Sequence, residues 1–275
     1  MMKTILVDPS RCLQCSNCWV ACKDEHCDND WSPITAPQGE NQWWIQVYET
    51  EVASGAHMKL HRVPVMCQHC THALCMEACS DNAIYRREDG YVIIDPNRCT
   101  GCESCVSACP YDRIFYNKEL NISQKCTMCA HLLDAGWEMP RCVRACPSDA
   151  LAFVEEKELN ATNMYAPLER YGSEYGTEPR VAYVNLPKVF VAGELMSENE
   201  KECVEGALIL AKNQVTGNVY EGYSGSFGDF HVDVNDPGFY TVSITAEGYK
   251  RKTFSNVDLS ESLSLDAVKL WPRNR

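Results

Sequence analysis

Four cysteines in residues 98–110 are separated by two, two and three residues, and the last is followed directly by a proline. This spacing is typical of segments that hold cubane iron–sulfur clusters, where three thiolates bind one cube and the fourth binds a neighbouring cube. One such run therefore predicts partner runs. Sixteen of the eighteen cysteines do fall into four quartets. The quartets are Cys12, Cys15, Cys18 and Cys22; Cys67, Cys70, Cys75 and Cys79; Cys99, Cys102, Cys105 and Cys109; and Cys126, Cys129, Cys142 and Cys146.

The quartets are related by an internal repeat. Segment 8–22 matches segment 95–109 at its Asp-Pro pair, an arginine, an alanine and all four cysteines, and segment 75–84 matches segment 142–151 less completely. A repeat of this kind indicates duplicated structural units. We therefore predict two ferredoxin-like units, one inserted within the other, and an α+β fold class for the whole chain.

Zinc and disulfides are the alternatives to clusters. Zinc ribbons use Cys-x-x-Cys pairs, but they do not use four quartets with three-residue tails, two of which end in Pro110 and Pro147. Cys-x-x-Cys spacing is also poor for ordinary disulfides, and the N-terminus has no hydrophobic signal core that would indicate secretion. Clusters are therefore the favoured interpretation.

Other side chains near the quartets are expected not to be cluster ligands. His69 and His72 interrupt the second quartet, but four cysteines are already present and the spacing is wrong for a Rieske centre, so we expect local hydrogen bonds or a partner contact. Cys27 and Cys203 are expected to be plain thiols. Five basic residues either offset cluster charge, which raises the reduction potential, or are simply solvated. They are Arg11, Arg98, Lys125, Arg141 and Arg144.

Composition excludes some functions. The net charge of −13 argues against nucleic-acid binding, which needs a basic surface. No run of about 18 apolar residues is present, so we expect no membrane span and a cytoplasmic location. There is also no phosphate-binding glycine loop, nucleophile elbow or nicotinamide fingerprint. We expect the chain to carry electrons while bond-making chemistry takes place elsewhere.

The chain is expected to contain three parts. Residues 1–156 form the double ferredoxin-like domain, with an insertion at 28–65, and residues 157–195 form an irregular connector that wraps a partner or the cluster domain. Asp89-Gly90 predicts a hairpin between the second and third quartets. Residues 196–275 alternate short β-rich runs with turn residues, which predicts a transthyretin-like or immunoglobulin-like β-sandwich.

The front half resembles the iron–sulfur subunits of the dimethyl-sulfoxide-reductase family of molybdenum enzymes. The order of the quartets and the segment from Lys125 to Pro147 carry this resemblance. It implies a large partner that holds molybdenum on two pterin guanine dinucleotides. It also implies four ligand sets, although Lys23 and Ser80 replace prolines that often follow the last cysteine, so four clusters or three are expected. The sets are Cys12, Cys15, Cys18 and Cys146; Cys22, Cys126, Cys129 and Cys142; Cys67, Cys70, Cys75 and Cys109; and Cys79, Cys99, Cys102 and Cys105.

The back half of the chain indicates which members of this family it resembles. Gly206 to Leu270 is similar to carboxypeptidase-regulatory β-domains, whereas many relatives end in a segment that reaches a membrane subunit. Together these features resemble the small subunits of the pyrogallol–phloroglucinol transhydroxylases. The expected function is electron transfer for such an enzyme. A free polyferredoxin with a β binding module, the electron carrier of another soluble molybdenum enzyme, and a subunit whose clusters only brace the fold are the alternatives.

Overall fold

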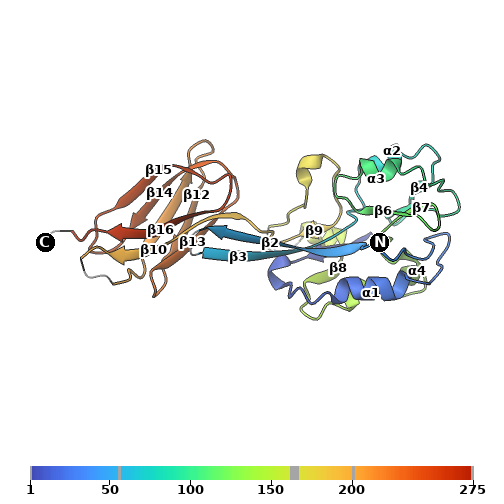
Figure 1. Cartoon of the computed structure of the whole chain (residues 1–275), viewed down its shortest axis with the longest axis horizontal. Helices are drawn as coiled ribbons and strands as arrows, with labels where there is room; N and C mark the ends of the chain where they lie inside the picture. The colour runs from blue at the N-terminus through green and yellow to red at the C-terminus, as the bar shows by residue number, and fades with distance from the viewer. Residues whose placement is uncertain (1, 55–56, 162–166, 200–201, 274–275) are drawn as a thin grey trace. The chain divides into compact units, whose positions relative to one another are not determined.

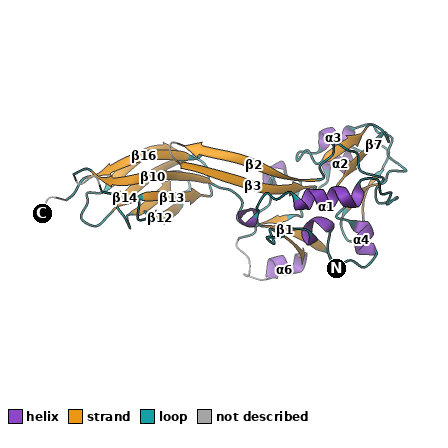
Figure 2. Cartoon of the chain, turned by 60° about the horizontal axis from the view of Figure 1, so that its bottom comes forward, coloured by secondary structure: helices purple, strands orange, loops and turns teal. Residues whose placement is uncertain are grey.

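The structure, a computed structural model, describes residues 2–54, 57–161, 167–199 and 202–273. The chain divides into two compact units (Figure 1). The front unit comprises Met1–Glu49 and Arg62–Leu186, and the β unit comprises Thr50–His61 and Pro187–Arg275. Among the described residues, helices are confined to the front unit, and the β unit is built from strands and loops (Figure 2).

One small sheet holds together distant parts of the front unit. Strand β1 (Lys3–Val7) pairs antiparallel with β8 (Leu151–Glu155) and parallel with β9 (Ala182–Tyr183), in the order β8-β1-β9. Four of the five β1 residues are buried, which fits a central strand with a very apolar sequence. The sheet therefore fixes the two ends of the cysteine-rich segment beside each other.

Short helices follow the cysteine loops. They are α1 (Asn17–His26), α2 (Leu74–Glu77), α3 (Ser104–Ala108), α4 (Ala130–Asp134) and α5 (Arg141–Arg144), with η1 (Pro9–Arg11), α6 (Glu156–Ala161) and η2 (Ser173–Tyr175) completing the set. Helix α1 of the first quartet packs on α5 of the fourth, and α2 of the second packs on α3 of the third. Figure 1 shows α2 and α3 together and apart from α1 and α4.

Three hairpins complete the front unit. The predicted turn at Asp89-Gly90 joins β4 (Ile84–Arg86) to β5 (Val92–Ile94), and Gly90 has the positive φ of 85° that such a turn needs. The second hairpin pairs β6 (Ile114–Asn117) with β7 (Ile122–Lys125). The predicted insertion contains β2 (Ile45–Ser54) and β3 (His57–Met66), whose distal ends belong to the β unit.

The β unit contains a mixed three-stranded sheet and an antiparallel four-stranded sheet. One has the order β13-β10-β16 and the other β12-β11-β14-β15. Their strands are β10 (Val189–Ser197), β11 (Leu208–Asn213), β12 (Val219–Tyr223), β13 (Asp229–Val234), β14 (Phe239–Thr245), β15 (Lys252–Asp258) and β16 (Leu263–Leu270). Every second residue of β13 is buried, as expected when one face of a strand covers a core. Because β10 pairs with β13 and β16, this unit begins at Pro187, whereas the sequence placed the boundary at 196.

Candidate iron–sulfur sites

The structure brings the sixteen cysteines of the quartets together in four groups of neighbouring thiols. Their membership is the one that the resemblance implied for the cluster ligands, and binding of iron by these thiols remains a prediction. Site 1 contains Cys12, Cys15, Cys18 and Cys146; site 2 contains Cys22, Cys126, Cys129 and Cys142; site 3 contains Cys67, Cys70, Cys75 and Cys109; and site 4 contains Cys79, Cys99, Cys102 and Cys105.

The grouping follows from which thiols act on one another electrostatically. The pKa of Cys18 in site 1 is raised to about 12, mainly by burial and further by the other three thiols of that site. The same two causes raise the pKa of Cys22 in site 2 and of Cys105 in site 4. In site 3 they raise the pKa of Cys75 to about 12, against the opposing effect of the Lys125 charge.

Site 3 encloses a small cavity with mainly apolar walls. All four thiols of the site line it, together with Ala73, Leu74, Val92 and Ile114. No three Cys, His or carboxylate side chains in the described ranges are placed to hold one metal ion in common. A cubane does not require that arrangement, because each of its four thiolates binds a different iron.

Buried thiols are unfavourable as thiolates unless a positive charge is close to them. In site 2, burial raises the pKa of Cys126 to about 11 and that of Cys129 to about 12. Iron supplies the positive charge that stabilises the thiolate form. The donor set of each site therefore fits a 4Fe-4S cluster, which would supply one-electron redox chemistry when bound.

The cysteine loops also direct backbone amides at sulfur. The Ser123 amide donates to Cys99 Sγ at 3.3 Å, and the Met128 amide donates to Cys126 Sγ at 3.4 Å. Left-handed residues in these loops, such as Ser16 (φ 65°) and Glu103 (φ 57°), allow the chain to curl around its cysteines. Hydrogen bonds of this kind to cluster sulfurs raise the reduction potential.

Comparisons with known proteins agree with this geometry. Residues 58–156 match the family model described as a 4Fe-4S dicluster domain, and residues 191–268 match the carboxypeptidase regulatory-like domain. The chain is 35% identical to the pyrogallol hydroxytransferase small subunit of Pelobacter acidigallici over 95% of this chain and 96% of that protein. The chain belongs to the iron–sulfur subunits of the dimethyl-sulfoxide-reductase family of molybdenum enzymes.

Two further relatives are named as parts of reductases. One is a tetrathionate reductase subunit of Salmonella typhimurium, which is 33% identical over 68% of this chain and 74% of its own length. The other is a putative dimethyl sulfoxide reductase iron-sulfur subunit of Halobacterium salinarum, which is 29% identical over 80% of this chain and 92% of its own length. This iron–sulfur subunit is therefore a non-catalytic electron-transfer chain with 4Fe-4S clusters, and family members are parts of enzymes with several subunits.

The four sites of this iron–sulfur subunit can be placed in a spatial order from the contacts between neighbouring sites. Cys22 of site 2 interacts with Cys18 of site 1, and Cys126 of site 2 interacts with Cys67 of site 3. Helix α3 carries Cys105 of site 4 and is followed by Cys109 of site 3. The order along the molecule is therefore site 1, site 2, site 3 and site 4. Site 2 has only part-buried or buried thiols, whereas sites 1 and 4 each have an exposed one, at Cys15 and Cys102.

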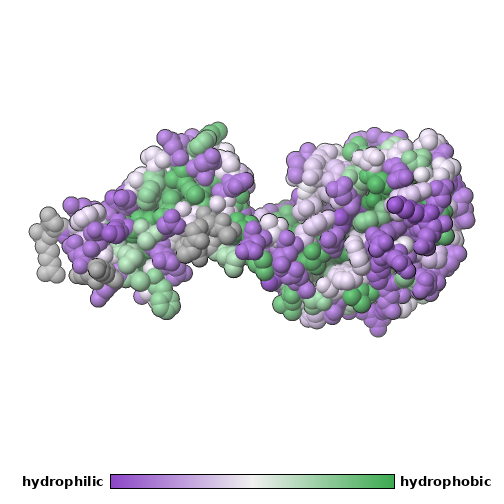
Figure 3. Space-filling model, viewed as in Figure 1, coloured by the Kyte–Doolittle hydropathy of each residue, from purple (hydrophilic) through white to green (hydrophobic). Residues whose placement is uncertain are grey.

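Exposed apolar side chains lie beside the cysteines of site 1. Near site 1, the side chains of Leu13 and Val20 are 64% and 53% exposed, and Trp43 packs edge-on against Trp19 at 4.7 Å. On the face of the front unit seen in Figure 3, hydrophilic residues predominate and hydrophobic ones are interspersed among them. Among the described residues, no helix is both long and apolar enough to cross a membrane.

The five predicted basic residues have different surroundings. Arg11 forms an exposed ion pair with Asp149, Arg141 pairs with Asp24 and Glu25, and the Arg144 guanidinium lies 5.0 Å from the Trp137 ring centre. Arg98 is exposed. Lys125 differs from them because it is only 2% exposed and donates to a cysteine sulfur. Charge compensation at a cluster is therefore best supported for Lys125.

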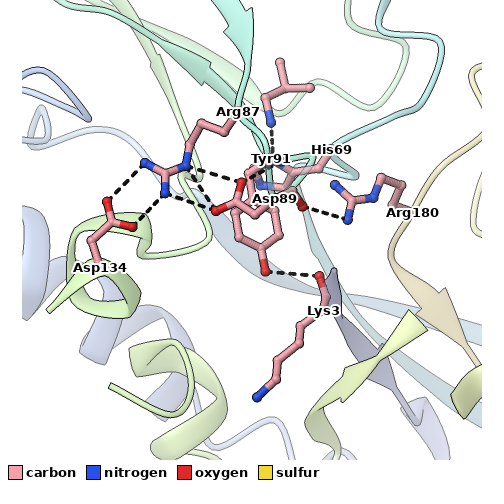
Figure 4. A network of polar contacts seen from close by, with 8 residues as sticks. Lys3, His69, Arg87, Asp89, Tyr91, Asp134 and Arg180 are labelled. Carbon is pink, nitrogen blue, oxygen red and sulfur yellow. Dashed lines mark hydrogen bonds and ion pairs between the residues drawn. The ribbon is translucent and has the colours of Figure 1, made fainter. Parts of the chain in front are cut away.

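The two histidines of the second quartet make local contacts. His69 is buried, and its Nδ1 atom accepts a hydrogen bond from the Val92 amide nitrogen at 3.1 Å, so this ring nitrogen carries no proton. The Nδ1 atom of His72 lies 3.3 Å from a carboxylate oxygen of Glu77. Figure 4 shows His69 against the ring of Tyr91, whose hydroxyl donates to the Lys3 carbonyl at 3.1 Å. The second-quartet loop is thereby linked to strand β1.

Sequence reasoning missed the ion pairs that hold the predicted hairpin in place. Arg87 pairs with Asp89 in its own turn and with Asp134 of α4, at 2.7 Å for the closest contact (Figure 4). Arg180 pairs with Glu156 and also donates to the Asp89 carbonyl at 3.2 Å. Apart from the Arg87–Asp89 pair, these contacts join residues far apart in the chain, and no local sequence signal identifies them.

Proposed function

We propose that this chain is the iron–sulfur subunit of a transhydroxylase that converts pyrogallol to phloroglucinol by moving a hydroxyl group between phenols. It holds four 4Fe-4S clusters at sites 1 to 4 and docks on a large subunit that binds molybdenum through two pterin guanine dinucleotides. The observation that carries the proposal is the match to the pyrogallol hydroxytransferase small subunit, which spans 95% of the chain and so includes both units. The match to the tetrathionate reductase subunit spans 68% of the chain.

The order of the sites supports a path for electrons through the front unit. Buried site 2 lies between site 1 and site 3, and the two ends have exposed thiols at Cys15 and Cys102. We place the large subunit at site 1, because exposed Leu13 and Val20 there provide the apolar surface typical of a lasting interface. Site 4 is then the end at which an external one-electron carrier exchanges electrons.

The overall transfer of a hydroxyl between two phenols leaves the oxidation states unchanged. A path for electrons is therefore not needed at every turnover. We propose that the clusters set the oxidation state of the molybdenum before the catalytic cycle begins. This role explains how a redox-neutral enzyme could retain an electron-transfer subunit.

Metal analysis of the native complex tests the proposal. The complex is purified without oxygen, and iron, acid-labile sulfide and molybdenum are measured per copy of this chain. We expect about 16 iron atoms from four cubes, together with molybdenum in a co-purifying large subunit and conversion of pyrogallol. About 12 iron atoms would reduce the number of clusters to three. Iron without molybdenum or a large subunit would contradict the proposal and favour the free polyferredoxin.

A ligand substitution separates electron transfer from a purely structural role of the clusters. Cys75→Ser in site 3 removes a ligand, whereas Cys27→Ser changes a cysteine outside the four sites. We expect Cys75→Ser to leave the complex assembled but to abolish activation of oxidised enzyme by an external reductant. Enzyme that was reduced beforehand should still turn over. Full activation in Cys75→Ser, with its site 3 cluster lost, would contradict the proposed path.

A further inference from the structure

The side-chain nitrogen of Lys125 lies between sites 2 and 3 and contacts three hydrogen-bond acceptors. The Lys125 Nζ atom lies 3.4 Å from Cys67 Sγ of site 3 and 3.1 Å from the carbonyl oxygen of Cys126 in site 2. It also donates to the Val92 carbonyl. The side chain is 2% exposed, so bulk water does not reach it. Lys125 ends strand β7, and this strand holds the ammonium group at the contact between sites 2 and 3.

The geometry calls for a charged ammonium once Cys67 is held as a thiolate. A neutral amine has two N–H groups, whereas an ammonium has three and accepts nothing. With Cys67 bound to a cluster as a thiolate, Lys125 contacts three acceptors, one sulfur and two carbonyls, so all three bonds form only when the nitrogen is protonated. A cluster at site 3 is therefore accompanied by a full positive charge in the interior of the front unit.

No carboxylate in the described part of the chain forms an ion pair with this charge. Arg141, in contrast, has two carboxylate partners, Asp24 and Glu25, and Arg11 has Asp149. A buried charge without a counterion is strongly unfavourable. The groups near Lys125 that become negative are the thiols of Cys67 and Cys75 in site 3 and Cys126 in site 2. The counterion of Lys125 is thus a thiolate-bound cluster, and above all the one at site 3.

We propose that Lys125 sets the reduction potential of the site 3 cluster and makes it easier to reduce than it would be without this charge. The inference rests on the proposed function, because it needs a cluster at that site. Reduction adds one electron to the cluster, supplied by the molybdenum subunit or by an external one-electron carrier, and no atom is transferred. A fixed positive charge in a dry interior favours the more negative state of a neighbouring group.

The position of Lys125 gives the charge a role in the path. Site 3 lies between site 2 and exposed site 4, so its potential determines whether an electron rests there or passes on. Site 2 also contacts Lys125, but through a carbonyl oxygen and not through sulfur. We therefore expect the larger effect at site 3 and a smaller effect of the same sign at site 2.

Redox titration of the intact complex tests the inference. Lys125→Met keeps the length and removes the charge, and Lys118→Met removes an exposed lysine from the same β6–β7 hairpin as a matched control. The clusters are followed by electron paramagnetic resonance, and the signal of site 3 is assigned as the one that Cys75→Ser alters. We expect Lys125→Met to change the reduced-to-oxidised ratio of this cluster about tenfold at a fixed potential, which is a fall in midpoint of about 59 mV. Lys118→Met should change no midpoint.

Two further variants keep the inference falsifiable if Lys125→Met loses its cluster. Lys125→Gln keeps two N–H donors without a charge, and Lys125→Arg keeps the charge. We expect the first to lower the site 3 midpoint and the second to keep it near that of the natural chain. An unchanged site 3 midpoint in Lys125→Gln or Lys125→Met, in protein with its full content of iron and sulfide, would overturn the inference. Lys125 would then only support the fold through its hydrogen bonds. Absence of iron from the natural complex would instead overturn the proposed function.

Discussion

The front unit and the β unit bury different kinds of side chain. The main core of the front unit includes the thiols of Cys18, Cys22 and Cys142, and a second core includes that of Cys105. The core of the β unit consists of aliphatic and aromatic side chains, among them Phe230 and Tyr240. One unit thus places its metal ligands where the other places hydrophobic side chains.

The lengths of the secondary-structure elements differ in the same way. Four of the five helices that follow the cysteine loops have only four or five residues, too short to be stable by themselves. The strands of the β unit have five to nine residues, and β13 among them alternates buried with exposed positions. The front unit therefore depends on cross-links between its loops, whereas the β unit depends on apolar burial.

Removal of iron should have the largest effect and should separate the two units. We expect oxidative treatment of the full chain with ferricyanide and a chelator to unfold much of the front unit, because buried thiols then lose their positive counterions. The β unit should stay folded. Hydrogen exchange measured by mass spectrometry checks this, with amides of α1 and α3 losing protection and those of β11 and β14 keeping it.

The matched control is the same chelator without the oxidant, which leaves clusters in place. Protection that persists in α1 and α3 after complete loss of iron would contradict the comparison. It would show that thiol packing alone holds the front unit together. Loss of protection in both units would mean that the β unit also depends on the clusters.

The converse substitution should damage only the β unit. Phe230 is 2% exposed and packs closely over Gly193. We expect Phe230→Ala to lower the free energy of unfolding of the β unit by about 3–5 kcal/mol, since it removes a large side chain from the core. Iron content and the visible absorbance of the clusters should not change. Denaturant titration, followed by cluster absorbance and by far-ultraviolet circular dichroism, checks both units at once.

Phe227→Ala is the matched control, because Phe227 is 80% exposed and its loss should cost little. A fall in iron content in Phe230→Ala, with Phe227→Ala normal, would show that the units are energetically coupled. That result would replace the picture of two independent kinds of core.

The strands with regular alternation could be predicted from the sequence. Among the short β-rich runs predicted for residues 196–275, those at 229–234 and 263–270 coincide with β13 and β16. Strand β15 was missed because only Val257 of its seven residues is buried, so its sequence lacks the alternating pattern. Strand β3 was also missed, and Pro64 within it weakens the sequence signal for a strand. Edge positions and a proline thus hid strands that tertiary pairing stabilises.

The groups of thiols could be expected from spacing and resemblance, because each cysteine loop is a local feature. The surroundings of the sites could not. Lys125 was one of five candidate basic residues, and its partners Cys67 and Val92 are 58 and 33 residues away. Arg87 and Asp134 are 47 residues apart and belong to a hairpin and a helix. Contacts of this range depend on how the units of the fold pack, which no window of sequence contains.

Acid should lower the stability of the β unit gradually, and this effect should be smaller than those of iron removal and of Phe230→Ala. In the β unit, Asp236 accepts hydrogen bonds from the hydroxyl groups of Thr216 at 2.6 Å and Tyr240 at 3.0 Å. It also accepts one from the Tyr220 hydroxyl and one from the Asn218 amide at 3.3 Å. These bonds, above all the one from Thr216, lower the pKa of Asp236 from 3.8 to about 2. The folded β unit therefore binds this proton less readily than the unfolded chain does.

A carboxylate with a lowered pKa stabilises the fold above its unfolded pKa, and this stability is lost as the pH falls towards the folded pKa. For Asp236 that range runs from about pH 4 to about pH 2. Hydrogen exchange in β13 and β14 of the full chain measures it, since the β unit is followed separately from the clusters. We expect protection to decline more steeply over this range in the natural chain than in Asp236→Asn, while Asp266→Asn, an exposed control, follows the natural chain. Equal slopes in all three proteins would assign the acid sensitivity of the β unit to other carboxylates, and would leave apolar burial as its main source of stability.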